Sequence, residues 1–72
     1  MGVPVTVRFD EKRPVLVDGV PSGFETNEVF EVEAGPHVFE LQGIQNYVPL
    51  RLTVNLSYTS QTAPSAITFK RS

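Results

Sequence analysis

Apolar and polar residues alternate along most of this chain, and the longest alternating run covers residues 47–56. A period of two is typical of a β-strand with one buried face, because successive side chains of a strand point to opposite sides. Shorter runs with the same period, and one wholly apolar run at 14–17, occur elsewhere in the chain. We therefore predict six short strands, at residues 3–9, 14–17, 30–33, 39–42, 47–56 and 67–69.

Residues that can reverse the chain separate these runs. Asp18 and Gly19 follow the second predicted strand, and Gly35 precedes the fourth. Because glycine readily adopts the positive φ that a tight reversal needs, we interpret these three positions as structural turns. Residues 20–23 contain proline and glycine and are predicted to continue the first turn. Pro49 has no N–H to donate, which predicts that the 47–56 strand begins at a sheet edge or a bulge.

No helix longer than one turn is expected. Residues 22–25 have the spacing of a helix capping box, but residues 29–33 have a period of two. Short strands separated by turns indicate an all-β fold, here a small antiparallel β-sandwich of six to seven short strands. The 72 residues are expected to form one domain, residues 1–72, with a core so thin that a partner or a neighbouring domain would add stability.

Composition excludes several classes of function. The formal net charge of −2 leaves no basic face for nucleic acid, and no apolar run approaches the roughly 18 residues of a membrane span. The chain has no cysteine and a single histidine, His37, so most catalytic constellations cannot be assembled. We expect no enzyme, no cofactor, no metal site, no nucleic-acid partner and no direct membrane insertion. The opening residues show no secretory signal, and the compartment is left open.

Three aromatic residues in or near predicted loops are the candidates for a binding surface: Phe24, Tyr47 and Tyr58. Exposed aromatic rings stack on sugar rings and anchor protein partners. The alternative interpretation is that one or more of these rings closes an end of the small core. His37 shares the parity of Phe39, so we interpret it as a histidine on the inner face that is hydrogen-bonded to a turn, rather than as a general base.

The order of several short motifs resembles the PEGA domain family. The matching segments are Val-Leu-Val-Asp-Gly at 15–19, Gly23, Ala-Gly-Pro-His-Val-Phe-Glu-Leu at 34–41, and Asn46 with Tyr47. Residues 26–27 are Thr-Asn where the family has Thr-Pro, and the Pro-Glu-Gly-Ala segment itself is absent. The resemblance covers residues 15–56, and residues 59–72 extend beyond it as a loop and either an added strand or a tail.

The resemblance implies a small β-sandwich, similar in shape to transthyretin-like and carboxypeptidase-regulatory modules. Such modules are usually appended to bacterial or archaeal envelope proteins, which implies the cell envelope or an extracytoplasmic location, and they supply no catalytic residues. The leading prediction is a non-enzymatic β-sandwich module that mediates protein interaction or assembly. The alternative is a carbohydrate-binding module that uses the loop aromatics.

Unpaired strand edges lead to a prediction of self-association. Residues 65–70 contain neither a proline nor an inward charge that would block pairing. Ile67 and Phe69 need an apolar face, which either the chain's own sheet or a second copy supplies. We predict a weak homodimer through the closing or the opening strand.

The carboxylates predicted on the outer, solvated face of a hairpin are Glu31, Glu33 and Glu40.

Overall fold

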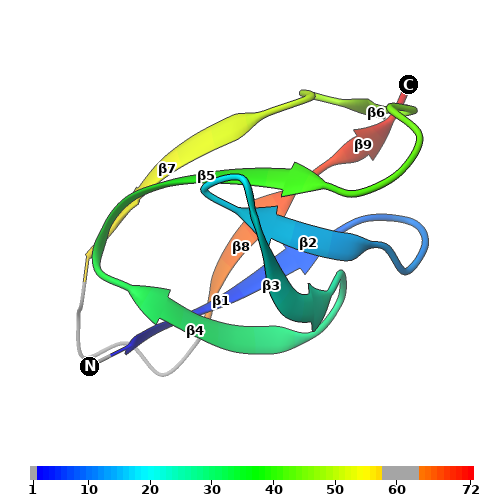
Figure 1. The fold of residues 1–72 in the computed structure, drawn as a ribbon. Coiled ribbons are helices and arrows are strands. Elements are labelled where there is room, and N and C mark those ends of the chain that lie inside the picture. The colour runs from blue at the N-terminus through cyan, green and yellow to red at the C-terminus, as the bar shows by residue number, and fades with distance from the viewer. Residues whose placement is uncertain (1, 58–63) are drawn as a thin grey trace.

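The computed structural model describes residues 2–57 and 64–72, and over these residues every regular element is a β-strand (Figure 1). The nine strands are β1 (Gly2–Arg8), β2 (Pro14–Val17), β3 (Val20–Glu25), β4 (Val29–Glu33), β5 (Gly35–Leu41), β6 (Tyr47–Val48), β7 (Leu52–Leu56), β8 (Ser65–Thr68) and β9 (Lys70–Arg71). The predicted all-β fold class is confirmed, with more strands in the described residues than the six to seven expected. Within the described ranges there is no helix long and apolar enough to cross a membrane.

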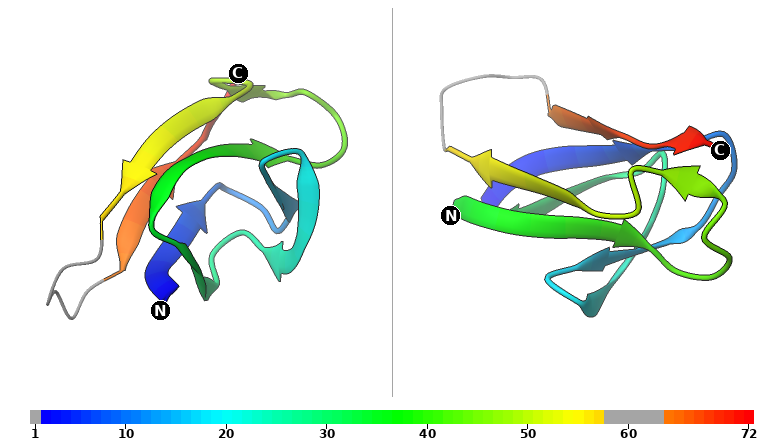
Figure 2. Two further views of the ribbon diagram at one scale, coloured as in Figure 1. Left: turned by 60° about the vertical axis from the view of Figure 1, so that its left-hand side comes forward. Right: turned by 90° about the horizontal axis from the view of Figure 1, so that it is seen from above.

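Two sheets enclose the core. The first has the order β4-β1-β8 and the second the order β3-β2-β5-β7, while β6 and β9 pair separately. The chain passes from the second sheet to the first between β7 and β8, and β8 lies parallel to β1 (Figure 2). This pair corrects the expectation of a purely antiparallel sandwich. A strand that arrives from the facing sheet is free to run in either direction, whereas the two strands of a hairpin must be antiparallel.

Residues 20–25 form β3, although residues 20–23 were expected to continue a turn. Asp18 and Gly19 alone reverse the chain, with φ of 54° and 78°. Positive φ at both central residues gives a two-residue turn whose twist matches that of the flanking strands, so Val17 and Val20 pair directly. The composition of residues 20–23 is misleading because proline and glycine, which favour turns, are also tolerated on an edge strand.

Residues 47–56 form two strands that belong to different sheets, not the single long strand expected. β6 pairs with β9, whereas β7 pairs with β5. The break begins at Pro49, as expected for a residue whose missing N–H cannot continue a ladder. Val48 and Leu50 are consequently 48% and 46% exposed, although the alternation places them on the same face as the buried Leu56.

The core combines aliphatic residues of both sheets with an aromatic cluster. The Tyr47 ring meets Phe9 and Phe69 edge to face, with centroids 6.0 and 5.4 Å apart. Ile67 is also buried, so β8 docks on its own sheet beside β1. Since β1 is the central strand of that sheet, the prediction that the opening strand pairs with a second copy is wrong. The buried apolar residues of the described chain are Val3, Val5, Val7, Phe9, Val15, Phe30, Phe39, Leu41, Tyr47, Leu56, Ile67 and Phe69.

Candidate functional site: a groove between two edge strands

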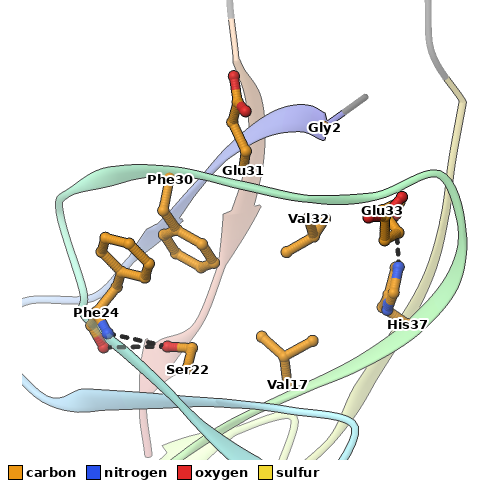
Figure 3. A pocket seen from close by; sticks show the side chains of 9 residues that line it. All are labelled: Gly2, Val17, Ser22, Phe24, Phe30, Glu31, Val32, Glu33 and His37. Carbon is orange, nitrogen blue, oxygen red and sulfur yellow. Dashed lines mark hydrogen bonds between the residues drawn. The ribbon is translucent and has the colours of Figure 1, made fainter.

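A groove opens on the flank of the sandwich where the edge strands β3 and β4 lie across from each other (Figure 3). Its volume is about 460 Å³, and both sheets contribute to its lining. β4 supplies the upper wall in Figure 3, β2 and β3 supply the lower wall, and β5 closes one end. The side chains that form its walls and end are Val17, Ser22, Phe24, Phe30, Val32 and His37.

The apolar wall of this groove is built around two stacked phenylalanines. The Phe24 and Phe30 rings are almost parallel, with an interplanar angle of 5° and centroids 4.8 Å apart. Phe30 lies on the inward face of β4, with its neighbours in the strand pointing outward, and is buried. Phe24 remains 43% exposed. Figure 3 shows Val17 and Val32 pointing into the same space from opposite walls. The groove therefore offers one half-exposed aromatic ring on an otherwise anchored apolar surface.

An irregularity in β3 brings Phe24 to the groove. Pro14 and Leu16 of β2 pair with Glu25 and Pro21 of β3. The two paired positions are therefore two residues apart in β2 and four residues apart in β3. Gly23 sits in this bulge with φ of 82°. The Ser22 hydroxyl donates to the Val15 carbonyl at 2.8 Å and accepts from the Phe24 N–H at 3.1 Å. Bulges bend a strand and re-aim its side chains, which is their effect on Phe24 here.

A histidine closes the opposite end of the groove. His37 Nδ1 lies 2.7 Å from Asp18 Oδ2, and Nε2 lies 2.6 Å from the Glu33 carbonyl oxygen. Both partners are acceptors, so the protonated ring satisfies both contacts by donating from each nitrogen. The hydrogen bond with Asp18, followed by that with the Glu33 carbonyl, raises the pKa of His37 against the opposing effect of partial burial. The expected hydrogen bond between His37 and a turn is present.

Acidic side chains border the groove along β4. Glu31 and Glu33 are exposed and alternate with Phe30 and Val32, which point inward. In Figure 3 the Glu31 carboxylate points away from the cavity. Among the residues described, no lysine or arginine lies within ion-pair distance of either carboxylate. The border along β4 therefore carries two carboxylates with no lysine or arginine paired to them in these parts of the chain, and the protonated His37 ring, whose pKa the Glu33 charge also helps to raise, lies at the Glu33 end.

The three aromatic candidates have different outcomes. Phe24 lies in the groove and is half-exposed. Tyr47 is 2% exposed, and its hydroxyl donates to the Leu41 carbonyl at 2.7 Å, so it is part of the core, as in the alternative interpretation of these rings, and not part of an exposed binding surface. The Tyr47 ring is buried because Tyr47 belongs to β6 and its ring packs against Phe9 and Phe69. Tyr58 lies outside the described residues.

The turn residues lie at the two bends that border the groove. Asp18 and Gly19 join β2 to β3, and the Asp18 carboxylate also accepts from the Val38 N–H at 2.9 Å. That backbone bond, with the His37 bond after it, lowers the pKa of Asp18. Gly35 has φ of 121° where β4 gives way to β5, a conformation that is open to glycine. Both bends hold His37 at the groove's end.

Sequence reasoning missed most of the groove. The alternation correctly points Phe30 and Val32 inward, but it contains no information on which strands lie at an edge. Val17 was expected in a buried strand and instead reaches the groove wall. Over the described residues, no group of three or more histidine, cysteine and acidic side chains is arranged to hold a metal ion.

Comparison of the chain with protein-family models, with curated proteins and with solved structures found no match. The resemblance to the PEGA family stays a prediction from the sequence motifs.

Proposed function

We propose that this chain is a non-enzymatic β-sandwich module that mediates protein interaction, with the groove between β3 and β4 as its binding site. The observation that carries the proposal is the half-exposed Phe24 ring, held flat against buried Phe30 at the mouth of an apolar groove. Aromatic residues anchored in this way are typical centres of protein interfaces. The Ser22 hydroxyl at the rim supplies a polar group that orients a bound partner, and the His37 ring, bonded to Asp18 and Glu33, closes the end of the groove.

The resemblance to PEGA domains is part of this proposal. Its motif residues have structural surroundings that suit the family pattern: Asp18 and Gly19 make a turn, Gly35 a reversal, and Tyr47 a buried contact. A module of this family would be appended to an envelope-associated protein, and the groove would then serve assembly with a neighbouring protein. This assignment is supported by the order of the motifs and by the turns that their residues form.

Carbohydrate binding is the second candidate, and a specific observation favours it. One side of the Phe24 ring is covered by Phe30, which leaves the ring pre-positioned to stack on a sugar. The Ser22 hydroxyl borders the same groove and keeps a lone pair that can accept a hydrogen bond from a sugar hydroxyl, whereas both His37 nitrogens are already bonded within the chain.

Two parallel screens separate these functions. A phage-displayed peptide library and a glycan array are probed with the wild-type chain and with Phe24→Ser. Ile44→Ser is the matched control, because Ile44 is an apolar residue that is 77% exposed and lies outside the groove. Thermal unfolding establishes that each variant is folded.

We expect enrichment of peptides by the wild type and the control, with loss of enrichment for Phe24→Ser. Reproducible binding of one sugar class, lost in the same variant, would favour the carbohydrate-binding module instead. Equal enrichment by wild type and Phe24→Ser contradicts a function for the groove.

Homodimer formation is a separate proposal, restricted to β8. The Phe69 N–H donates to the Arg8 carbonyl of β1 at 2.9 Å, so by alternation the Thr68 N–H points to the outer edge. A second copy would pair there. Sedimentation equilibrium should show a weak dimer for the wild type and a monomer for Thr68→Pro, which lacks that N–H. A wild-type monomer at high protein concentration contradicts the dimer.

A further inference from the structure

The outer edge of β4 presents backbone groups to solvent. In the pairing with β1, Glu31 lies opposite Pro4, which has no N–H. Antiparallel pairs alternate between those that exchange hydrogen bonds and those that exchange none, so the Pro4 pair is of the second kind. The Val7 carbonyl accepts from the Asn27 N–H at 2.6 Å, which fits the same alternation. The N–H and C=O of Glu31 therefore point away from β1, as do those of Val29.

The facing edge, on β3, is a poor template for another strand. Pro21 interrupts it, since proline has no N–H to donate, and Gly23 sits in the bulge. β4 contains neither residue over Val29–Glu33. Of the two strands that flank the groove, only β4 has an uninterrupted edge to which an extended chain can bind.

A strand added to β4 would lie over the groove. The sheet that contains β4 has three strands, and the facing sheet has four, with β3 at the same flank. Alternate side chains of the added strand would point into the groove, toward Phe24, Val17 and Val32. A volume of about 460 Å³ lined by these groups suits aliphatic side chains at alternate positions.

The acidic side chains of β4 determine which residue types suit the outward positions of the added strand. Its outward side chains would lie next to Glu31 and Glu33, neither of which has a lysine or arginine within ion-pair distance among the residues described. The protonated His37 ring offsets part of the Glu33 charge and leaves that of Glu31. Opposite charges on neighbouring strands attract, and like charges directly opposite each other are destabilising. A second copy paired antiparallel through β4 would place acidic residues against acidic residues. The occupant is therefore a basic segment from another protein.

We propose that the module binds an extended segment of a protein partner, in which aliphatic residues alternate with lysine or arginine, by strand addition to the outer edge of β4. This inference rests on the proposed function, because it specifies how a protein partner occupies the groove. Backbone hydrogen bonds to Val29 and Glu31 supply the pairing, and the groove and the acidic border select the sequence.

Synthetic peptides test the chemistry of the occupant. The probe is an extended peptide in which lysine alternates with valine, and the control replaces each lysine by glutamate. Binding is followed by amide chemical shifts and by hydrogen exchange of the chain. We expect the lysine peptide to bind, to protect the amides of Val29 and Glu31, and to bind more weakly as ionic strength rises. The glutamate peptide is expected not to bind.

Two changes to the edge separate strand addition from other contacts in the groove. Glu31→Pro removes an N–H that β1 does not use, and we expect about tenfold weaker binding. Glu31→Gln keeps the N–H and removes the charge, with an expected loss of about two- to fivefold. If Glu31→Pro fails to fold, the same test is made on the wild type with a peptide N-methylated at the residues that face β4.

The outcomes distinguish this inference from the proposed function. Unchanged affinity for both Glu31→Pro and the N-methylated peptide, together with loss of binding in Phe24→Ser, overturns strand addition and leaves the groove as a protein-binding site. Unchanged peptide binding in Phe24→Ser overturns the proposed function. Binding of the glutamate peptide, or a dimer that Glu31→Pro abolishes, overturns the basic partner.

Discussion

The Asp18 carboxylate joins two strands by contacting His37 with one oxygen and the Val38 N–H with the other, at 2.7 and 2.9 Å. Asp18 belongs to the β2–β3 turn, whereas His37 and Val38 lie in β5. Because His37 also contacts the Glu33 carbonyl at 2.6 Å, the same ring connects this turn to the end of β4. The groove thus has a polar end whose geometry depends on the charge of one histidine.

Stability is expected to depend on pH through this pair. The pKa of His37 is raised in the folded chain, so its contribution is complete below the unfolded value of about 6.5 and is lost as pH rises through the folded value. The pKa of Asp18 is lowered, so its contribution is complete above about pH 4 and is lost as pH falls through the folded value.

The difference in melting temperature between wild type and His37→Gln should therefore be largest between about pH 4 and 6.5 and should narrow at alkaline pH. A proton NMR titration of the His37 ring should show a midpoint above 6.5. A midpoint at or below that value would mean that the ring is neutral when it contacts Asp18.

Gly19→Val is expected to destabilise the β2–β3 turn by about 1–2 kcal/mol, because a β-branched residue is strained at positive φ. Gly19 has φ of 78°, and a Cβ there would contact no atom within 4 Å, so the effect is conformational and not steric. Gly19→Asn is the control, since asparagine tolerates this region. Urea unfolding should show a clear loss for valine and a smaller one for asparagine; equal losses would contradict the conformational explanation.

Thr26 is expected to be the most sensitive polar residue of the core. It is completely buried, and its hydroxyl donates to the Glu11 carbonyl at 2.7 Å while it accepts from the Arg13 N–H at 2.9 Å. Thr26→Val leaves both backbone groups unpaired and should cost about 2 kcal/mol. Thr26→Ser keeps both hydrogen bonds and should cost about 1 kcal/mol for the lost methyl group. Denaturant unfolding gives both values, and a valine variant as stable as the serine variant would refute the prediction.

Arg13 is expected to hold the loop at residues 42–46. Its guanidinium donates to the Gln42 and Ile44 carbonyls at 2.8 and 2.6 Å and to the Asn46 side-chain oxygen at 2.9 Å. Lysine lacks this planar set of donors, so Arg13→Lys should speed hydrogen exchange throughout the loop and lower stability by about 1–2 kcal/mol.

Arg51→Lys is the control for this substitution, because the Arg51 side chain is 70% exposed. Its one ion-pair contact among the described residues, with a Glu40 oxygen at 3.7 Å, is long and weak. Arg51→Lys should leave exchange in the loop unchanged. Equal exchange in both variants would mean that Arg13 does not order residues 42–46.

Local patterns in the sequence predicted the features that depend on neighbouring residues. The alternation in β4 placed Phe30 and Val32 inward and Glu31 outward, as the structure has them. The Asp-Gly pair at 18–19 predicted a reversal, because the positive φ it needs is a property of single residues. The parity of His37 predicted its contact with a turn.

Features that depend on distant segments were not predictable in this way. The 47–56 alternation is continuous, yet β6 and β7 pair with different partners, so the pattern alone placed Val48 on a buried face. Tyr47 was expected near a loop and is buried because Phe9 and Phe69 meet it there. Residues 20–23 have the composition of a turn but form part of a strand, because they pair with β2.

The alternation of side chains specifies which face of a strand is apolar, since that depends only on the strand's own residues. It does not specify which strand lies beside it, because pairing and register are set by contacts between residues far apart in the chain. The groove exists because β3 and β4 are both edge strands, one from each sheet, and lie across from each other with no strand of the described chain between them. Both properties arise from long-range pairing, so they are present only in the folded chain.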